Sequence, residues 1–251
     1  MELGYVLAEG KTKIVYAHPA DPDLAILRHK DGITAGDGAR RSVIEGKGAL
    51  AGQTTANVFR LLNRAGIATH FIDAPEPTLT VVRRCAMIPL EVVMRRLPAG
   101  SYLRRHPEAA GQRFDPPLVE FFLKDDARHD PQIMPQEIVA QGIATPAEVE
   151  QMTNTGRRVF LTLEEAWAAL DVTLVDLKIE FGRARDGSLL VADVIDNDSW
   201  RIWPGGDPNR MLDKQVYRNA QVIDEALLAD VRERYALVAE LTGRWVVEEG
   251  R

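Results

Sequence analysis

The residues best placed to do chemistry lie in one run, DLKIEFGRARDGSLLVADVIDNDSWRIW at positions 176–203. Asp186-Gly187 separates two strand-like halves, and this dipeptide is typical of a tight β-hairpin turn. If the turn has two residues, counting back along both strands places Glu180 directly opposite Asp193. Two facing carboxylates repel each other unless a cation lies between them, and carboxylate oxygens are typical ligands of Mg²⁺. The pattern therefore predicts a magnesium site at Glu180 and Asp193.

The strand register decides whether this site can form. Asp176, Lys178 and Glu180 alternate with apolar residues, so the three charged side chains share one face of the first strand. A slip of one residue would put Glu180 and Asp193 on opposite faces. The hairpin would then be an ordinary pair of strands with a solvated, charged face.

A lysine-rich turn near the N-terminus is a second candidate site. The sequence GKTK at 10–13 lies between two strand-like runs. It differs from a Walker A loop, because Gly4 is one residue too far away and a strand-like run follows in place of a helix. A glycine turn that carries Lys11 and Lys13 can still cover a triphosphate, as glycine-rich hairpin loops do in kinases. The alternative is a surface hairpin with solvated lysines.

A basic turn in the middle of the chain is a third candidate. Arg95 and Arg96 precede Gly100-Ser101, a turn that could present N–H groups, a hydroxyl and guanidinium groups to a phosphate monoester. A basic surface loop is the alternative. Further along, the polar run KDDARHDP at 124–131 contains His129, which could be an acid or base or simply be solvated. The sequence shows no Ser-His-Asp or Cys-His pair and no zinc-type Cys/His spacing.

Composition limits the classes of function. The chain has 251 residues, of which 45% are hydrophobic and 27% charged, and its net charge is −6 at pH 7. This balance does not favour nucleic-acid binding, so phosphate-bearing ligands need local basic clusters. The one cysteine, Cys85, cannot form an internal disulfide, which is typical of a reducing compartment. Since no signal-peptide pattern and no membrane-length apolar run is present, we expect a cytoplasmic protein without a membrane span.

Local signals predict a β-rich first third and a mixed remainder. Strands are expected at 5–16 (two strands), 23–29, 67–72, 78–84 and 90–94, and a loop at 30–40. Helices are expected at 46–65, 145–170 and 224–241. The second helix begins with the capping box TPAE, and Gly66 and Gly243 should end the first and third. Pro89 should interrupt the segment 85–105.

Seven segments, taken together, resemble the SAICAR synthetase family of purine biosynthesis. They occur in the family's order and span most of the chain: EGKTKIVY, KDGITAGDGAR, IPLEVVMRRLPAGS, FFLKDDARHDP, LVDLKIEFG, ADVIDNDSWRIWP and DKQVYR. The ADVIDNDSW form is similar to the animal bifunctional enzyme, which also carries a carboxylase domain. For this chain we expect the synthetase activity alone. Val194 replaces an acid of the common bacterial form, and we expect it to face away from Asp193.

The resemblance implies an ATP-dependent ligase. Its substrates would be ATP, L-aspartate and carboxyaminoimidazole ribonucleotide (CAIR), and its products the succinocarboxamide, ADP and phosphate. A carboxylate is a poor acyl donor, and phosphoryl transfer from ATP would convert it to an acyl phosphate that the aspartate amine can attack. Such chemistry needs positioning and charge neutralisation more than a protein nucleophile.

The resemblance also implies roles for individual residues. The ATP site would comprise Gly10, Lys11, Lys13, Arg83, Met87 and Lys178. The CAIR and aspartate sites would comprise Asp37, Glu91, Arg95, Ser101, Lys124, Asp130, Asp176 and Arg201, with Arg95, Ser101 and Arg201 holding CAIR. Glu180 and Asp193 would hold Mg²⁺, and the catalytic residues would be Lys178, Arg95 and Asp130.

The fold that the resemblance implies is α+β. An N-terminal antiparallel β-rich lobe at 1–84, like the small lobe of kinases and of ATP-grasp enzymes, would lie over a larger mixed domain at 85–251, with ATP in the cleft between them. A homo-oligomer is expected. Two other functions stay open: a small-molecule kinase on the same frame, which would consume ATP without aspartate, and a silent nucleotide-binding module. The presence of Lys11, Glu180, Asp193 and Arg201 argues against the silent module.

Overall fold

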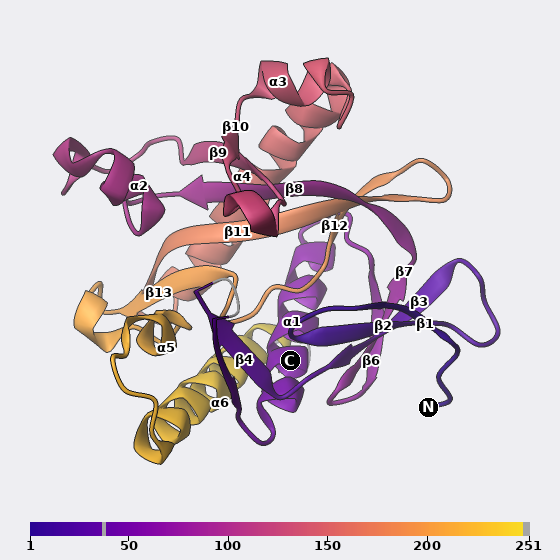
Figure 1. Cartoon of the computed structure of the whole chain (residues 1–251), viewed down its shortest axis with the longest axis horizontal. Coiled ribbons are helices and arrows are strands. Elements are labelled where there is room, and N and C mark those ends of the chain that lie inside the picture. The colour runs from indigo at the N-terminus through magenta and orange to yellow at the C-terminus, as the bar shows by residue number, and fades with distance from the viewer. Residues whose placement is uncertain (37–38, 248–251) are drawn as a thin grey trace.

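Two antiparallel sheets form the framework of the computed structural model, which describes residues 1–36 and 39–247 (Figure 1). The first sheet contains, in spatial order, β1 (Val6–Glu9), β2 (Lys13–Ala17), β3 (Leu24–His29), β7 (Leu79–Arg83) and β6 (Phe71–Glu76). The second contains β10 (Gln132–Ile133), β9 (Leu118–Leu123), β8 (Cys85–Arg95), β11 (Val172–Ala184) and β12 (Leu189–Ala192). The first half of β11 also pairs with β13 (Trp200–Pro204), and a separate hairpin joins β4 (Gly32–Ala35) and β5 (Arg40–Val43).

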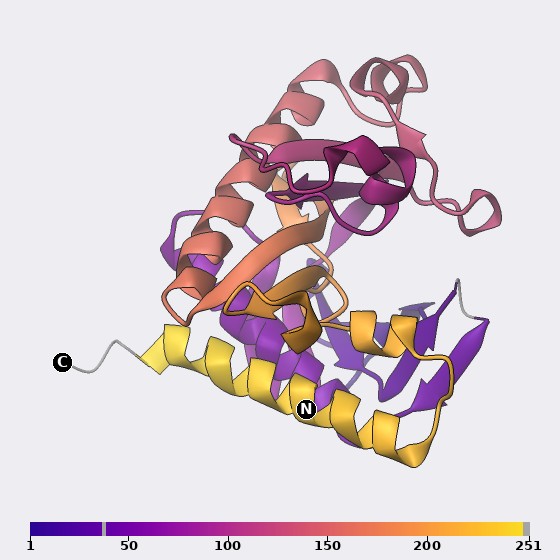
Figure 2. The ribbon, with the colours of Figure 1, turned by 90° about the vertical axis from the view of Figure 1, so that its left-hand side faces the viewer.

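Helices cover the outer faces of both sheets. The α-helices are α1 (Lys47–Arg64), α2 (Ser101–Arg105), α3 (Pro135–Ala140), α4 (Pro146–Ala168), α5 (Gln215–Asn219) and α6 (Glu225–Val247). Short 3₁₀ turns lie at Pro107–Ala109, Asp126–Arg128 and Pro208–Arg210. Helix α4 packs on β11 and β8, whereas α1 packs on the first sheet and α6 runs along α1 (Figure 2).

The expected α+β class with an N-terminal antiparallel β-rich lobe is confirmed. The last strand of the first sheet along the chain, β7, ends at Arg83, and the first strand of the second sheet, β8, begins at Cys85. The domain boundary was predicted at this position. One apolar core nevertheless runs through both parts, since Phe59 of α1 shares a cluster with Trp167 of α4 and Ile179 of β11. The division into two domains at 84/85 therefore stays a prediction.

Two local helix signals of the sequence are confirmed. The Thr145 hydroxyl accepts a hydrogen bond from the Glu148 N–H at 3.2 Å, and the Glu148 carboxylate accepts one from the Thr145 N–H at 2.8 Å. This is the predicted capping box at the start of α4. Gly66 follows α1 with a φ of +69°, the left-handed conformation that ends many helices.

Segment 85–105 is not one long helix, as Pro89 predicted: Pro89 lies in β8 at a bulge between the pairs Glu180–Glu91 and Gly182–Met87, where its missing N–H is not needed. Two other local predictions are wrong because of packing. Gly243 lies inside α6, which continues to Val247 against α1. The expected loop at 30–40 contains β4, whose Ile33 and Ala35 are buried against the C-terminal helices.

The described helices were compared with the requirements of a membrane-spanning helix. None of the helices within 1–36 and 39–247 combines the length and the apolar character that a bilayer crossing requires.

Two glycines inside helices give a test of this packing. A Cβ at Gly52 of α1 would lie 2.5 Å from the Pro77 carbonyl oxygen, whereas a Cβ at Gly243 of α6 would meet nothing closer than 3.8 Å. Gly52→Ala should lower the free energy of unfolding by about 1–3 kcal/mol, because backbone must move. Gly243→Ala, the matched control, should raise it by about 0.5–1 kcal/mol through helix propensity alone. Urea denaturation of both variants measures the difference, and equal gains would contradict the close approach of α1 to residue 77.

Candidate active site

A cavity of about 380 Å³ lies between the two sheets. Its charged lining comprises seven cationic and five acidic residues: Lys11, Lys13, Arg95, Lys178, Arg201, Lys214, Arg218, Glu91, Asp176, Asp193, Asp196 and Asp198. The cavity is thus positive overall in a chain whose net charge is −6. Such a local field favours anionic ligands.

The hairpin register differs from the predicted one by a single residue. Glu180 pairs with Ala192, and not with Asp193. The loop has three residues, closed by the Ala184 N–H donating to the Ser188 carbonyl at 2.9 Å, and Gly187 has a φ of +83°. Three-residue loops that end on a left-handed glycine are the next most common hairpin connection after two-residue loops. The prediction that Glu180 lies opposite Asp193 is therefore wrong.

Asp193 nevertheless reaches the cavity. Strand β12 ends at Ala192, and Asp193 has a left-handed φ of +68°, which ends the alternation of faces along the strand. Asp is among the few side chains that tolerate this region. The Asp193 carboxylate forms an ion pair with Lys13 of β2. Burial would raise the pKa of Asp193, but Lys13 and Lys178 outweigh it and hold this pKa well below its usual range.

A pair of facing carboxylates that the sequence did not predict lies on β11 and β8. Glu180 of β11 lies directly opposite Glu91 of β8. Lys178 lies between them, with its Nζ 3.0 Å from Glu180 Oε1 and 3.5 Å from Glu91 Oε1. Lys124 Nζ donates to the other Glu180 oxygen at 2.7 Å. Burial opposes the charge on Lys178, but Glu180 and Glu91 outweigh burial and raise its pKa well above the ordinary value.

The lysine turn closes one end of the cavity. Lys11, Thr12 and Lys13 line it, and the turn is held by the Gly10 N–H donating to the Lys13 carbonyl at 2.9 Å. Lys30 Nζ donates to the Gly10 carbonyl at 3.2 Å and so ties the turn to the end of β3. This end therefore presents backbone and ammonium groups from a fixed turn.

Two arginines and a serine occupy another end. Arg95 Nη1 donates to Asp176 Oδ2 at 2.8 Å, and Arg201 Nη1 donates to the same oxygen. Ser101 begins α2 directly after Gly100. A Cβ at Gly100 would lie 2.2 Å from Arg201 Nη2, so only glycine lets this turn lie against the guanidinium. The three predicted phosphate ligands are thus brought together.

A further charged cluster was missed in the sequence. Asp198 accepts hydrogen bonds from Lys214 Nζ at 2.5 Å and from Arg218 Nη2 at 2.7 Å. Burial opposes the charge on Asp198, but Lys214 and Arg218 lower its pKa to about 2. Burial raises the pKa of the neighbouring Asp196. The runs IDND and DKQVYR were visible as polar segments, but only the fold shows that they meet.

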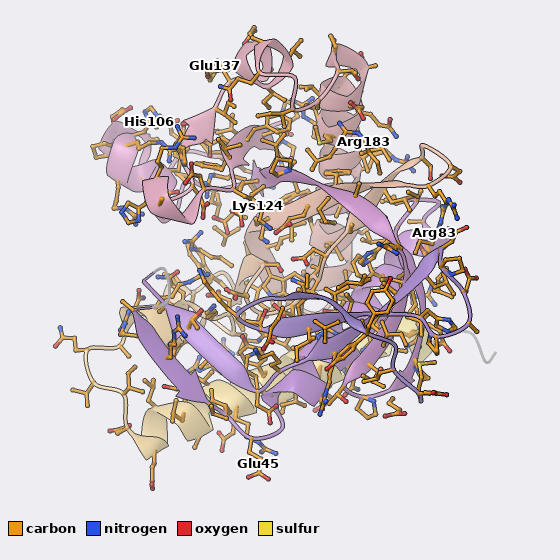
Figure 3. The ribbon with its side chains drawn as sticks, turned by 45° about the vertical axis from the view of Figure 1, so that its right-hand side comes forward. Glu45, Arg83, His106, Lys124, Glu137 and Arg183 are labelled. Carbon is orange, nitrogen blue, oxygen red and sulfur yellow. The ribbon has the colours of Figure 1, made fainter. Side chains whose placement is uncertain are left out.

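Several predicted residues are not part of the cavity lining. They are Gly10, Arg83, Met87, Lys124, Asp130 and Glu180, of which Lys124 and Glu180 contact the cluster around Lys178. Arg83 donates to Asp186 Oδ2 at 2.7 Å, at the hairpin turn, and lies well apart from Lys124 (Figure 3). Asp130 accepts a hydrogen bond from the Asp125 N–H at 2.7 Å. Asp37 lies outside the described residues.

Comparison with known proteins shows the family of the chain. The sequence model of the SAICAR synthetase family matches residues 6–233. The chain belongs to the SAICAR synthetase family. Phosphoribosylaminoimidazole-succinocarboxamide synthase of Chloroflexus aurantiacus is 90% identical over 98% of each chain.

Solved SAICAR synthetases share the fold. The enzyme of Ehrlichia chaffeensis matches with a TM-score of 0.86 and 31% identity, over 95% of this chain and 98% of that one. A SAICAR synthetase in complex with ADP matches with a TM-score of 0.82 and 35% identity, over 92% and 97%. The resemblance stated from the seven sequence segments is therefore confirmed.

The structure shows why an apolar residue fits at position 194. Val194 packs against the small cluster of Ala25, Leu27 and Val82 in the first sheet. Val194 thus joins the end of the hairpin to the N-terminal sheet, and it also lines the cavity next to Asp193. The expectation that it faces away from Asp193 stays a prediction.

The buried His29, which pairs with Lys13 across β3 and β2, gives a prediction of pH-dependent stability. Burial, together with Lys13, lowers the pKa of His29 to about 4, and its Nε2 lies 2.9 Å from Thr80 Oγ1. In the unfolded chain His29 takes up a proton near its ordinary pKa of ~6.5, whereas in the folded chain it stays neutral down to about pH 4. The free energy of unfolding is therefore highest above pH ~6.5 and falls as the pH drops toward 4. His29→Gln cannot gain this proton, so between pH 7.5 and 4.5 it should gain up to about 3 kcal/mol of unfolding free energy relative to wild type.

Urea denaturation at both pH values measures this difference. The surface variant His106→Gln, whose side chain is 45% exposed, is the control for the substitution itself. The same pH dependence in wild type and His29→Gln would show that His29 is not held neutral by the fold. His70, buried and with its pKa lowered to about 4 by burial, remains in all three proteins and cancels from the comparison.

Proposed function

We propose that the chain joins L-aspartate to CAIR at the expense of ATP, in de novo purine biosynthesis. The observation that carries this proposal is one positively charged cavity between the two sheets. A lysine turn lies at one end, two arginines and a serine lie at another, and the Lys178 cluster lies between. Two phosphate-bearing substrates can therefore meet over one set of charges.

The chemistry balances without a protein nucleophile. The CAIR carboxylate attacks the γ-phosphorus of ATP, ADP leaves, and an acyl phosphate forms. The amine of aspartate then attacks the acyl carbon, loses a proton, and expels phosphate as the amide forms. The chain has to align the reactants and neutralise charge as it moves between oxygens, which matches a cavity rich in cations.

At the nucleotide end, Lys11 and Lys13 bind the ATP phosphates under the Gly10 turn, and Lys178 contacts the transferring group. Met87 lies at the adenine edge, and its 44% exposure leaves its side chain available to a ring. Arg83 lies beyond it, held by Asp186. The likeness to a SAICAR synthetase solved in complex with ADP supports nucleotide binding by this chain.

The residues present fit Mg²⁺ in one way. Among residues 1–36 and 39–247 no group of three or more His, Cys, Asp or Glu side chains is arranged to hold a metal ion. Two carboxylates completed by substrate phosphates remain, the usual arrangement for Mg²⁺. Glu180 and Asp193 would hold the ion, in place of the lysines that contact them in this structure: Lys178 and Lys124 at Glu180, and Lys13 at Asp193. The ion would neutralise phosphate charge.

At the other end, Arg95, Ser101 and Arg201 bind the CAIR phosphate, and Asp176 holds both arginines in place. The remaining predicted residues of the CAIR and aspartate sites keep their proposed places near the cleft: Asp37, Glu91, Lys124 and Asp130. Lys178, Arg95 and Asp130 are the proposed catalytic residues. Lys214 and Arg218, which line the same cavity, supply further cations for the second substrate.

The setting of this activity is also part of the proposal. Residues 1–84 form the ATP-binding lobe and 85–251 the substrate- and metal-binding domain. The partners are small molecules, with neither nucleic acid nor membrane, and the chain acts in the cytoplasm as a homo-oligomer. The acidic net charge of −6 supports the absence of nucleic acid.

The decisive test measures ADP release from MgATP with CAIR, with and without L-aspartate, and follows the product by mass. We expect release only with both substrates and a product mass equal to CAIR plus aspartate minus water. Release with CAIR alone would instead indicate a small-molecule kinase. ATP binding without release under any combination would indicate a silent binding module.

Glu180→Gln tests the metal assignment. Loss of one carboxylate charge should lower kcat by about a hundredfold at a temperature where the variant is folded, because the ion loses a ligand. Glu45→Gln, an exposed position far from the cavity, is the control for loss of a charge (Figure 3). Near-normal turnover of Glu180→Gln at saturating Mg²⁺ would refute the assignment.

A further inference from the structure

A row of alternating charges crosses four neighbouring strands on the cavity side of the second sheet. Glu120 of β9, Arg95 of β8, Asp176 of β11 and Arg201 of β13 follow one another across the strands. Asp176 pairs in register with both arginines, and each successive pair in the row is joined by an ion pair. Arg95, Asp176 and Arg201 line the cavity, whereas Glu120 does not.

Glu120 uses both carboxylate oxygens. Oε2 accepts from Arg95 Nε at 2.6 Å, and Oε1 accepts from Arg105 Nη2. The Glu120 residue is 5% exposed, so these charge-assisted hydrogen bonds are shielded from water. Two guanidinium groups therefore approach one buried carboxylate that no substrate contact requires.

The first bond fixes the plane of a substrate-binding group. Arg95 donates Nε to Glu120 and Nη1 to Asp176 at 2.8 Å, so carboxylates hold two corners of its planar guanidinium. With both corners held, the group cannot rotate about its long axis. Its edge toward the cavity is therefore set before any ligand arrives.

The second bond fixes the serine. Arg105 is the last residue of α2 and Ser101 is the first. A five-residue helix is too short to hold its own position, so the bond from Arg105 to the buried Glu120 anchors it to β9. The same carboxylate thus anchors both the guanidinium of Arg95 and the helix that carries the Ser101 hydroxyl.

We propose that Glu120 is a positioning residue that assembles the phosphate-monoester site from Arg95 and Ser101 without touching the ligand. The proposal rests on the function proposed above, in which CAIR supplies the phosphate monoester. Without the Glu120 charge, Arg95 and Arg105 would repel each other across a buried space, and both anchors would loosen together.

The chain contains a matched control at the next residue, directly after the end of β8. Arg96 turns toward α4, where its Nε and Nη2 donate to the two oxygens of Glu164, each at 2.6 Å. This pair has the same chemistry and similar bond lengths, but neither residue lines the cavity. Removing the Glu164 charge therefore measures how much the loss of an arginine's carboxylate partner lowers the stability of the fold, without a change at the cavity.

The experiment compares Glu120→Gln with Glu164→Gln. Glu120→Gln should raise KM for CAIR by at least about tenfold, because the ligand must now pay to order Arg95 and Ser101, and leave KM for ATP unchanged. Glu164→Gln should lower the melting temperature and leave both KM values unchanged. Equal effects of the two variants, or a rise in both KM values of Glu120→Gln, would overturn the proposal.

A second variant covers the case in which Glu120→Gln does not fold. Arg105→Met removes the outer partner of Glu120 from a side chain that is 32% exposed. It should raise KM for CAIR by at least about threefold and leave KM for ATP unchanged, since only the anchor of α2 is lost. No change in KM for CAIR would overturn the proposal.

Failure of the proposed function gives a different result. If the wild-type chain forms no product from CAIR, ATP and aspartate, the same variants can be titrated with ribose 5-phosphate, a simple phosphate monoester, by calorimetry. Weaker binding to Glu120→Gln and Arg105→Met, with unchanged binding to Glu164→Gln, would support the positioning role independently of the reaction. Equal binding to all four proteins would refute it.

Discussion

The structure depends on one electrostatic constraint: acidic side chains on neighbouring strands must be neutralised where water is scarce. Glu180 and Glu91 face each other across β11 and β8, and their repulsion in a buried setting would separate the strands. Lys178, from β11 itself, occupies the space between them, and Lys124 holds the other oxygen of Glu180. Glu91 and Lys178 also line the cavity, so the central pairing of the second sheet and part of the cavity lining share one set of charges.

The cavity charges are organised by the same rule on a larger scale. Each acidic residue that lines the cavity beside a predicted phosphate site contacts at least one cation, as Asp193 contacts Lys13 and Asp176 contacts Arg95 and Arg201. Because cations outnumber acids in the lining, neutralisation leaves positive charge at the places where phosphates are proposed to bind. A protein of net charge −6 can in this way present a positive site without a basic surface.

Some signals that act within a few residues were reliable in the sequence, whereas Gly243 did not end its helix and Asp186-Gly187 did not form a two-residue loop. The capping box at Thr145 and the left-handed Gly66 both act through neighbouring backbone groups, and both are present as predicted. Interactions between distant segments were not predictable in this way. Strand β4 forms inside an expected loop, where its buried Ile33 and Ala35 share a cluster with Tyr217 and Tyr235, about two hundred positions later in the chain.

The sequence by itself determined the chemical inventory, the α+β class and the family, since residue types in a characteristic order survive any uncertainty about geometry. It also placed Lys178, Glu180 and Asp193 in one neighbourhood, because a hairpin brings its own strands together. The tertiary structure decided which carboxylates face each other. The three-residue loop moved the register by one position, the left-handed Asp193 turned its side chain back, and Glu91 arrived on a strand from the other side of β11. Register depends on loop conformation and on strands remote in sequence, and no count along one segment contains that information.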